Sequence, residues 1–270
     1  MLHKFERFVS EQHFSIWLSE NNLSSEIIFD SLSLITKRGI DSKFFGYVPP
    51  EEVVVSGNNY REQLKVKGLN SRQRALLEVL VSELSPASFR RTKIYAPEAI
   101  TDLACVLRGR FPWFIGSEYV DNAQKKKDLF PIACEDLQNL SFDSETFDVV
   151  LTCDVLEHVA DIRKSLAELA RVLREDGLML STHPFTWRKN STVRAVLKDG
   201  ELIHILKPEY HGNPIDPKNG SLVFTVPGWD ILEMCLDVGF KKAEMIMIAS
   251  SHLGIIGSDN GYVNVLRAQK

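Results

Sequence analysis

The chain has 270 residues, of which 44% are hydrophobic and 25% are charged, and its formal net charge is −4. This length can bury a sizeable core, and no apolar run approaches the roughly 20 residues of a membrane-spanning helix. The negative charge disfavours nucleic acid as the main partner, because contact with phosphates needs a basic surface. Charges interrupt every apolar cluster of the first residues, so we expect no secretory signal and a cytoplasmic location.

Residues 1–90 are expected to form a helical and irregular extension. Apolar residues between Phe5 and Leu18 indicate an amphipathic helix at the start. Glycines and prolines then divide the chain into turns and short extended pieces. A further helix is predicted to begin at Asn70 or Ser71 and to end before Pro86. Its apolar residues recur at helical spacing: Leu76, Leu77, Leu80, Val81 and Leu84.

From residue 91 onward, short apolar runs alternate with helical patterns. Seven strands are predicted, over residues 92–96, 113–119, 130–134, 147–153, 178–182, 241–249 and 262–267. Helices are predicted over residues 101–110, from Asp161 to Gly177, and over 229–238. Such alternation favours a parallel sheet with right-handed crossovers. The last two strands have no helix between them and are expected to pair antiparallel at one edge.

These patterns predict an α/β protein with a Rossmann-like, seven-stranded, mostly parallel sheet, helices on both faces and a helical N-terminal extension. The sheet domain is expected to span residues 91–270. Within it, residues 184–226 exceed the usual loop length of about 12–15 residues, which favours an insertion that covers the substrate.

Residues 147–159 read FDVVLTCDVLEHV, a buried strand followed by polar residues and a helical pattern. Polar residues at the carboxyl end of a parallel strand lie where open α/β folds bind ligands. With residues 140–143 (LSFD) and 166–177 (LAELARVLREDG), this segment resembles class I S-adenosylmethionine (SAM)-dependent methyltransferases, in particular a type 11-like bacterial branch. The resemblance covers about the last two thirds of the chain and implies SAM as the cofactor.

The resemblance also implies a set of cofactor-binding residues. Glu118 lies at the end of the second strand, where the family has an acid, and a carboxylate can accept from both ribose hydroxyls. Asp136 and Leu137 follow the third strand, at the family's position for the adenine. Cys153 and Asp154 are expected to run their backbone past the sulfonium. The alternative for Glu118 is a solvated carboxylate, and for Asp136 a plain aspartate turn.

One segment departs from the family pattern. The family's first strand leads into a glycine-rich loop, whereas residues 93–104 here read KIYAPEAITDLA, without a glycine. Glu98 is the candidate to replace the usual acid of that loop. The run APEAIT, with GRF and GSEY after it, resembles the same bacterial branch, which favours a specialised loop. The alternative is a degenerate copy that no longer binds SAM.

Candidates for the acceptor side follow the fifth strand. His183 lies just beyond it, and Tyr210 and His211 lie in PEYHGNP, which also resembles the bacterial branch. These three residues are the candidate catalytic groups, as a base or as groups that position the acceptor. For Tyr210 and His211 the alternative is a turn fastened by polar side chains. His158 is interpreted as a packing residue rather than a catalytic one.

No metal is expected. The four cysteines lie far apart and lack metal-ligand spacing. Residues 59–80 resemble a segment that in related proteins carries part of a zinc knuckle, but its cysteines are absent here. Arg61, Arg72 and Arg74 in this segment are either exposed helix residues or contacts for an anionic acceptor.

The expected function is SAM-dependent methyl transfer to a small polar metabolite, such as a sugar or glycan precursor in bacterial biosynthesis, with oxygen as the acceptor atom. The alternative is a methyltransferase-like binding or scaffold protein that has lost SAM. A nucleotide-sugar or dinucleotide enzyme is disfavoured, because no phosphate-cradling glycine-rich loop is present. The acceptor itself and the oligomeric state are not predicted.

Overall fold

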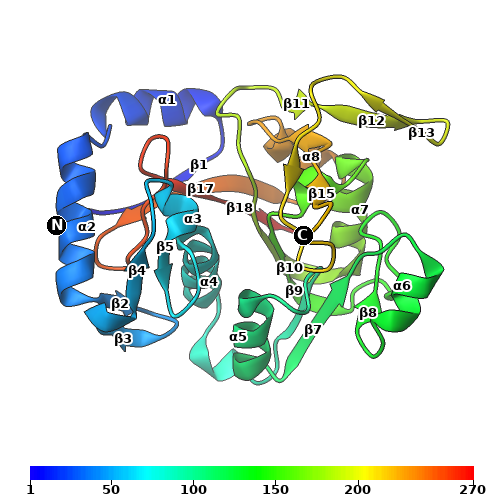
Figure 1. Ribbon diagram of the computed structural model, residues 1–270, viewed down its shortest axis with the longest axis horizontal. Coiled ribbons are helices and arrows are strands. Elements are labelled where there is room, and N and C mark those ends of the chain that lie inside the picture. Colours follow the sequence, from blue (N-terminus) through cyan, green and yellow to red (C-terminus); the bar gives the residue numbers. More distant parts are fainter. The chain divides into compact units, whose positions relative to one another are not determined.

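A computed structural model describes residues 1–270, apart from the side chain of Ala123 (Figure 1). The chain divides into two compact units. Unit 1 comprises Met1–Ser88 and Glu244–Arg267, and unit 2 comprises Phe89–Ala243 and Ala268–Lys270. None of the described helices has the length and hydropathy needed to cross a bilayer. The domain limits inferred from the sequence, 1–90 and 91–270, remain a prediction.

Unit 1 combines helices with short strand pairs. Its helices are α1 (Glu11–Glu20), α2 (Ser25–Arg38), α3 (Tyr60–Gln63) and α4 (Ser71–Glu83), with short 3-10 turns η1 (Pro50–Glu52) and η2 (Pro86–Ser88). Antiparallel pairs join β2 (Ile40–Ser42) to β3 (Gly46–Val48) and β4 (Val53–Val55) to β5 (Leu64–Val66). The predicted helix after Asn70 is confirmed as α4. Asn70 and Gln73 form a capping box at its start.

The predicted helix over residues 5–18 is wrong in its first part. Residues His3–Phe8 form strand β1, which pairs antiparallel with the 245–250 part of β17 (Lys242–Ser250) and is an eighth strand beyond the seven predicted. The helix begins only at Glu11, after the N-cap Ser10. Local periodicity missed the strand because its partner lies more than 200 residues away in the chain.

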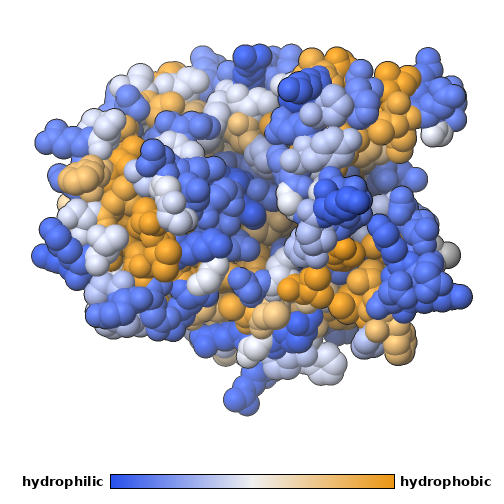
Figure 2. All heavy atoms as spheres, in the orientation of Figure 1, coloured by the Kyte–Doolittle hydropathy of each residue, from blue (hydrophilic) through white to orange (hydrophobic). Residues whose placement is uncertain are grey.

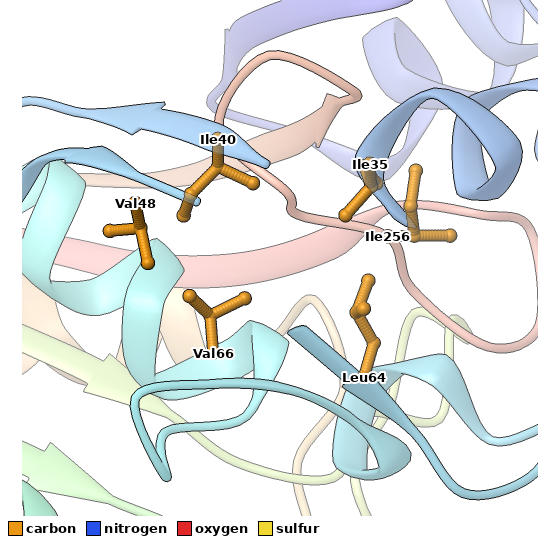
Figure 3. Packing of buried hydrophobic residues seen from close by; sticks show 6 residues of the cluster. All are labelled: Ile35, Ile40, Val48, Leu64, Val66 and Ile256. Carbon is orange, nitrogen blue, oxygen red and sulfur yellow. The ribbon is translucent and has the colours of Figure 1, made fainter. Parts of the chain in front are cut away.

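The core of unit 1 is aliphatic and comes from segments far apart in the sequence. Six buried side chains face one another in Figure 3: Ile35, Ile40, Val48, Leu64, Val66 and Ile256. Arg74 lies in the same unit and is almost fully buried, and its guanidinium donates to the carbonyl oxygens of Leu64, Leu69 and Gly254. Burial lowers its pKa to about 9, although Glu78 opposes this. Arg74 is therefore a structural residue, and its expected role as an exposed or acceptor-binding arginine is wrong.

Unit 2 contains a sheet with the strand order β17-β18-β10-β9-β6-β7-β8. Of β17 only the first residues, 242–243, belong to this unit, and of β18 only the last, 268–269. Apart from β17, the strands of this sheet are β6 (Lys93–Ala96), β7 (Trp113–Glu118), β8 (Ala133–Cys134), β9 (Phe147–Cys153), β10 (Leu173–Thr182) and β18 (Val263–Gln269). Neighbours from β10 to β8 are parallel. At the edge, Lys241 N donates to Gln269 O, which places the start of β17 beside the end of β18, as an antiparallel pair requires.

This arrangement confirms the predicted Rossmann-like α/β fold. Chain order runs outward from β6 to β8 on one side and returns with β9 beside β6, so the order reverses between β6 and β9. Ligands of open α/β sheets bind at the carboxyl ends of the strands near such a reversal. The helices of unit 2 are α5 (Asp102–Arg110), α6 (Ala123–Asp128), the 3-10 turn η3 (Leu156–His158), α7 (Ile162–Val172) and α8 (Ile231–Asp237).

Helix α7 is shorter than predicted. Asp161 caps it as expected, by accepting from Lys164 N, but the helix ends at Val172 and not at Gly177. Leu173 already pairs with Phe147, and the register then shifts before Leu178. The strand therefore starts five residues earlier than the apolar run at 178–182 indicated.

Residues 184–226 form three small antiparallel pairs. These are β11 (Thr192–Val193) with β16 (Thr225–Val226), β12 (Ala195–Lys198) with β13 (Glu201–His204), and β14 (Tyr210–His211) with β15 (Ser221–Leu222). The β12–β13 hairpin exposes several apolar side chains. Figure 2 shows apolar surface in the region where Figure 1 labels β12 and β13. The exposed side chains include Leu197, Leu202 and Ile203. That this segment covers a substrate remains a prediction.

Candidate active site

The carboxyl ends of β7, β8 and β9 bring the predicted cofactor residues to one edge of the sheet. Glu118 is the last residue of β7, Asp136 comes two residues after β8, and Cys153 ends β9. Glu135 N donates to Glu118 O at 2.9 Å, so the ends of β7 and β8 are joined directly. Parallel strands place these residues together because their carboxyl ends share an edge.

Glu118 holds the loop that follows β6. Its Oε1 accepts from Ala99 N at 2.8 Å and from Ile100 N at 3.2 Å. Burial raises the pKa of Glu118 above its ordinary value, although the two amides oppose this. A carboxylate that accepts two successive amides fixes the path of the backbone that carries them. The glycine-free loop is therefore an ordered element that is attached to the neighbouring strand.

Gly116 in β7 allows the loop after β6 to pack closely against this strand. A Cβ atom on Gly116 would lie 2.6 Å from Glu98 O and 3.0 Å from the Cα of Ala99. Only a residue without a side chain allows the loop to approach the strand this closely. The loop itself can therefore consist of residues with side chains, because the space is provided by the strand.

Glu98 holds the N-cap residue of α5 in place. Its side chain is buried, and its Oε2 accepts from Thr101 Oγ1 at 2.5 Å. Thr101 Oγ1 in turn accepts from Ala104 N at 3.1 Å and caps the helix. Arg108 closes the loop by donating to Ala99 O at 3.0 Å. Thr101 and Arg108 were not among the predicted site residues, although the N-cap preference for threonine could have pointed to the first.

Asp136 makes a tight turn after β8. Its Oδ1 accepts from Gln138 N at 2.8 Å, and Leu137 beside it is buried. The segment after this turn is held by α7, because Glu168 Oε2 accepts from Leu140 N and Arg171 donates to Leu140 O. The hydrogen bond from Arg171 lowers the pKa of Glu168, so the pair is ionised at neutral pH.

The end of β9 is fixed by Thr182 of the next strand. Asp154 N donates to Thr182 O at 2.8 Å, and Thr182 Oγ1 donates to Asp154 Oδ1 at 3.2 Å. Asp154 has a φ of +54°, in the left-handed region that few residues other than glycine adopt. Such strained positions concentrate at functional sites when the surrounding structure holds them in place. Cys153 Sγ also accepts from Thr182 Oγ1.

The three predicted acceptor-side residues have different surroundings. His183 is fully buried, and its Nδ1 lies 3.1 Å from Ser181 Oγ. Tyr210 is 55% exposed. His211, its neighbour on β14, is partly buried, with Nε2 3.2 Å from Glu209 Oε1 and Nδ1 3.5 Å from Glu157 Oε1.

Glu157 and His158 complete a cluster around His211 that the sequence interpretation did not include. The imidazole rings of His158 and His211 lie 5.1 Å apart between centroids, and His158 Nδ1 lies 2.8 Å from Leu222 O. The Glu157 carboxylate, against the opposing effect of burial and together with Glu209, raises the pKa of His211. Glu157 follows β9 in η3, whereas His211 belongs to the insertion. No local pattern connects the two positions.

Residues 115–181 match the model of a family described as "Methyltransferase domain". No curated protein matches the chain. Among solved structures, the chain is similar to a SAM-dependent methyltransferase from Thermotoga maritima, described as a possible histamine N-methyltransferase. The two chains are 15% identical, the match covers 74% of this chain and 90% of the other, and the TM-score is 0.43.

Two further structures show the same level of similarity. One is a SAM-dependent methyltransferase from Mesorhizobium loti, with 12% identity, coverage of 71% of this chain and 96% of the other, and a TM-score of 0.43. The second is the 1,6-didemethyltoxoflavin-N1-methyltransferase of Burkholderia thailandensis, solved with 1,6-didemethyltoxoflavin and S-adenosylhomocysteine. The two chains are 13% identical, the match covers 74% of this chain and 78% of the other, and the TM-score is 0.42.

Proposed function

We propose that this chain, which carries a class I SAM-dependent methyltransferase domain, transfers the methyl group of SAM to a polar small molecule. The observation that supports the proposal is the strand order with its reversal between β6 and β9, because Glu118 and Asp136 lie at the carboxyl ends of β7 and β8, the edge at which open α/β sheets bind ligands. In this chemistry the cofactor already carries an activated methyl group. The protein therefore has mainly to align an acceptor with it.

The carboxylates at this edge fit an adenosine. Among the described residues, the hydrogen bonds of Glu118 involve Oε1 and those of Asp136 involve Oδ1. Each residue therefore keeps one carboxylate oxygen for a ligand. An ionised carboxylate is only an acceptor, which suits ribose hydroxyls and the adenine amino group. We assign Glu118 to the ribose, and Asp136 with Leu137 to the adenine.

The remaining parts of the cofactor have suitable partners in the same region. SAM supplies the methyl group as part of a sulfonium when it is bound. The backbone of Cys153 and Asp154, which Thr182 holds, is assigned to that end of the cofactor. The first amides of α5 suit the carboxylate of the amino-acid tail, since helix N-termini favour anions. Glu98 positions these amides through Thr101.

On the acceptor side, we assign Tyr210 to contact with the substrate, because its phenol is exposed. His183 is buried against Phe185, with 6.1 Å between ring centroids, and is assigned to shaping the wall of the site. His211 positions the β14 strand next to η3. A hydroxyl of a sugar or of a glycan precursor is the acceptor we propose, in the cytoplasm of a bacterium.

The second candidate function is a methyltransferase-like binding protein without SAM. It is favoured by the same contact that orders the loop, because Ala99 and Ile100 already occupy one oxygen of Glu118. The two candidates differ in whether the remaining oxygen binds a ribose. A measurement of cofactor binding separates them.

Isothermal calorimetry with SAM and S-adenosylhomocysteine is the test. We expect micromolar binding to the wild type and binding at least about 10-fold weaker in Glu118→Gln, since a hydrogen bond to a charged group contributes about 1.5–3 kcal/mol. Glutamine can still accept from Ala99 N and Ile100 N, so the loop is expected to stay in place. Glu233→Ala, on the exposed surface of α8, is the matched control and should bind like the wild type.

A folded wild-type protein that binds neither compound would overturn the proposal and favour the scaffold. If both compounds bind, methyl transfer from radiolabelled SAM to a panel of nucleotide sugars, small amines and small thiols then tests the acceptor class. Label transferred only to amine or thiol acceptors would contradict the proposed sugar hydroxyl and leave the methyltransferase intact.

A further inference from the structure

Glu157 is a buried carboxylate without hydrogen bonds. Its side chain is 0% exposed, and neither Oε1 nor Oε2 has a hydrogen-bond partner among the described residues. Taking an ionised carboxylate out of water carries a large free-energy cost unless another charge compensates it. The imidazoles of His158 and His211 lie 3.6 Å and 3.5 Å from its Oε1. A bound cation would compensate the charge of this carboxylate.

Both histidines are held so that one ring nitrogen faces Glu157. His158 Nδ1 lies 2.8 Å from Leu222 O, which can only accept, so Nδ1 carries the proton. His211 Nε2 lies 3.2 Å from Glu209 Oε1, another acceptor, and carries its proton there. In the neutral rings, His158 Nε2 and His211 Nδ1 therefore present lone pairs. These are the two nitrogens that lie next to Glu157 Oε1.

Contacts of this kind are typical of metal-binding histidines. A ligating imidazole usually donates its other N–H to a backbone carbonyl or to a carboxylate, which fixes the tautomer and the ring. Leu222 O is such a carbonyl, and Glu209 is such a carboxylate. Arg194 Nη2 lies 3.0 Å from Glu209 Oε2 and holds it in turn. The hairpin also depends on Gly220, whose Cβ would collide with His211 O.

The separations of the three side chains fit a shared ion better than direct hydrogen bonds. His158 Nε2 lies 3.6 Å and His211 Nδ1 3.5 Å from Glu157 Oε1, beyond the usual hydrogen-bond range. Two ligand atoms on one tetrahedral zinc ion, each bound at about 2.0–2.2 Å, lie about 3.4 Å apart. One potential ligand atom from each residue lies within 4.8 Å of the others.

We propose that Glu157, His158 and His211 bind a divalent transition-metal ion of the zinc class. Two imidazoles and one carboxylate are ligands that Zn²⁺ and Fe²⁺ accept, whereas Mg²⁺ and Ca²⁺ prefer oxygen alone. Three protein ligands leave at least one coordination position for water or for an oxygen of a bound molecule. The ion neutralises the buried carboxylate and fastens β14 to η3, at the carboxyl end of β9.

This site is independent of the proposed methyl transfer, because it needs neither SAM nor Glu118. The experiment uses the full chain, stripped with a chelator and dialysed. Addition of Co²⁺ is expected to produce visible absorption bands of a nitrogen- and oxygen-ligated ion, saturating at one equivalent per chain. Zn²⁺ should displace the Co²⁺ and abolish the bands. Calorimetry with Zn²⁺ alone gives the dissociation constant.

Variants connect the signal to the three residues. His158→Ala, His211→Ala and Glu157→Gln are each expected to abolish the Co²⁺ bands. Glu209→Gln, which changes only the partner of His211, should weaken binding by about 10-fold or more. His204→Ala is the matched control, since His204 is exposed on β13 of the same insertion and should bind like the wild type.

Circular dichroism and thermal unfolding without metal show whether each variant is folded. If Glu157→Gln does not fold, the His211→Ala variant still tests the proposal, because His211 is partly exposed and its replacement disturbs the core less. A folded wild type that binds neither Co²⁺ nor Zn²⁺ would overturn the proposal. So would binding that survives unchanged in both His158→Ala and His211→Ala. Calorimetry with SAM decides the proposed function separately, so the failure of one does not imply the failure of the other.

Discussion

Single residues at the edge of the sheet combine structural and binding roles. Glu118 uses one oxygen for the amides of Ala99 and Ile100, and we assign the other to a ribose. Its place at the end of a strand was predictable from the sequence. Its contact with the loop was not, because Ala99 belongs to a different strand–helix unit about 20 residues earlier.

Gly116 offers a test of the loop at the same scale. Gly116→Ala places a Cβ against Glu98 O and is expected to displace the loop, to lower the thermal midpoint and to weaken SAM binding. Gly109→Ala is the control, because nothing lies within 4 Å of its Cβ position in helix α5. Alanine should stabilise that helix by about 1 kcal/mol. Equal thermal midpoints for the two variants would contradict the close approach of loop and strand.

At the scale of elements, helix α7 connects the sheet with the segment after Asp136. Its apolar residues, among them Leu166 and Leu169, are fully buried, and Arg171 donates to Phe142 O at 2.8 Å. The start of the helix was predictable because capping depends on neighbouring residues. Its end was not, because Leu173 leaves the helix to pair with β9.

The cap of α7 can be tested directly. Asp161→Ala removes the acceptor of Lys164 N, and we expect a loss of about 1 kcal/mol in the free energy of unfolding. Denaturation in urea, followed by circular dichroism, measures it. Asp237→Ala serves as the comparison, because it removes only an exposed ion pair with Arg163, and such pairs contribute little. A loss no larger in Asp161→Ala than in Asp237→Ala would argue against a stabilising cap.

At the scale of the whole molecule, the chain forms two units, and unit 1 contains both N-terminal residues and residues 244–267. In unit 1, Glu83 of α4 accepts from Arg7 of β1 at 2.7 Å and from Arg267 of β18 at 2.8 Å. Burial alone would raise the pKa of Glu83, but Arg267 and Arg7 outweigh it and hold the pKa below its ordinary value.

This network predicts a dependence of stability on pH. Because the folded-state pKa of Glu83 is lowered, its contribution is present above the unfolded value of about 4.3 and is lost as the pH falls through the folded value. Glu83→Gln should therefore be less stable than the wild type at pH 7, with the difference shrinking toward pH 3. Urea denaturation at several pH values measures this, with the exposed Glu20→Gln as control. A difference independent of pH would contradict the assignment.

The sequence by itself determined the alternation of strands and helices, the helix caps at Asn70 and Asp161, and the acids at or just after the ends of β7 and β8. These features depend on residues within a few positions of one another, so periodicity and capping preferences reveal them. Only the tertiary structure decided that residues 3–8 form a strand, that Arg74 is buried, and that Glu157, His158 and His211 lie together. Those outcomes depend on contacts between distant segments and on burial, which removes water from a charge and which no short pattern encodes.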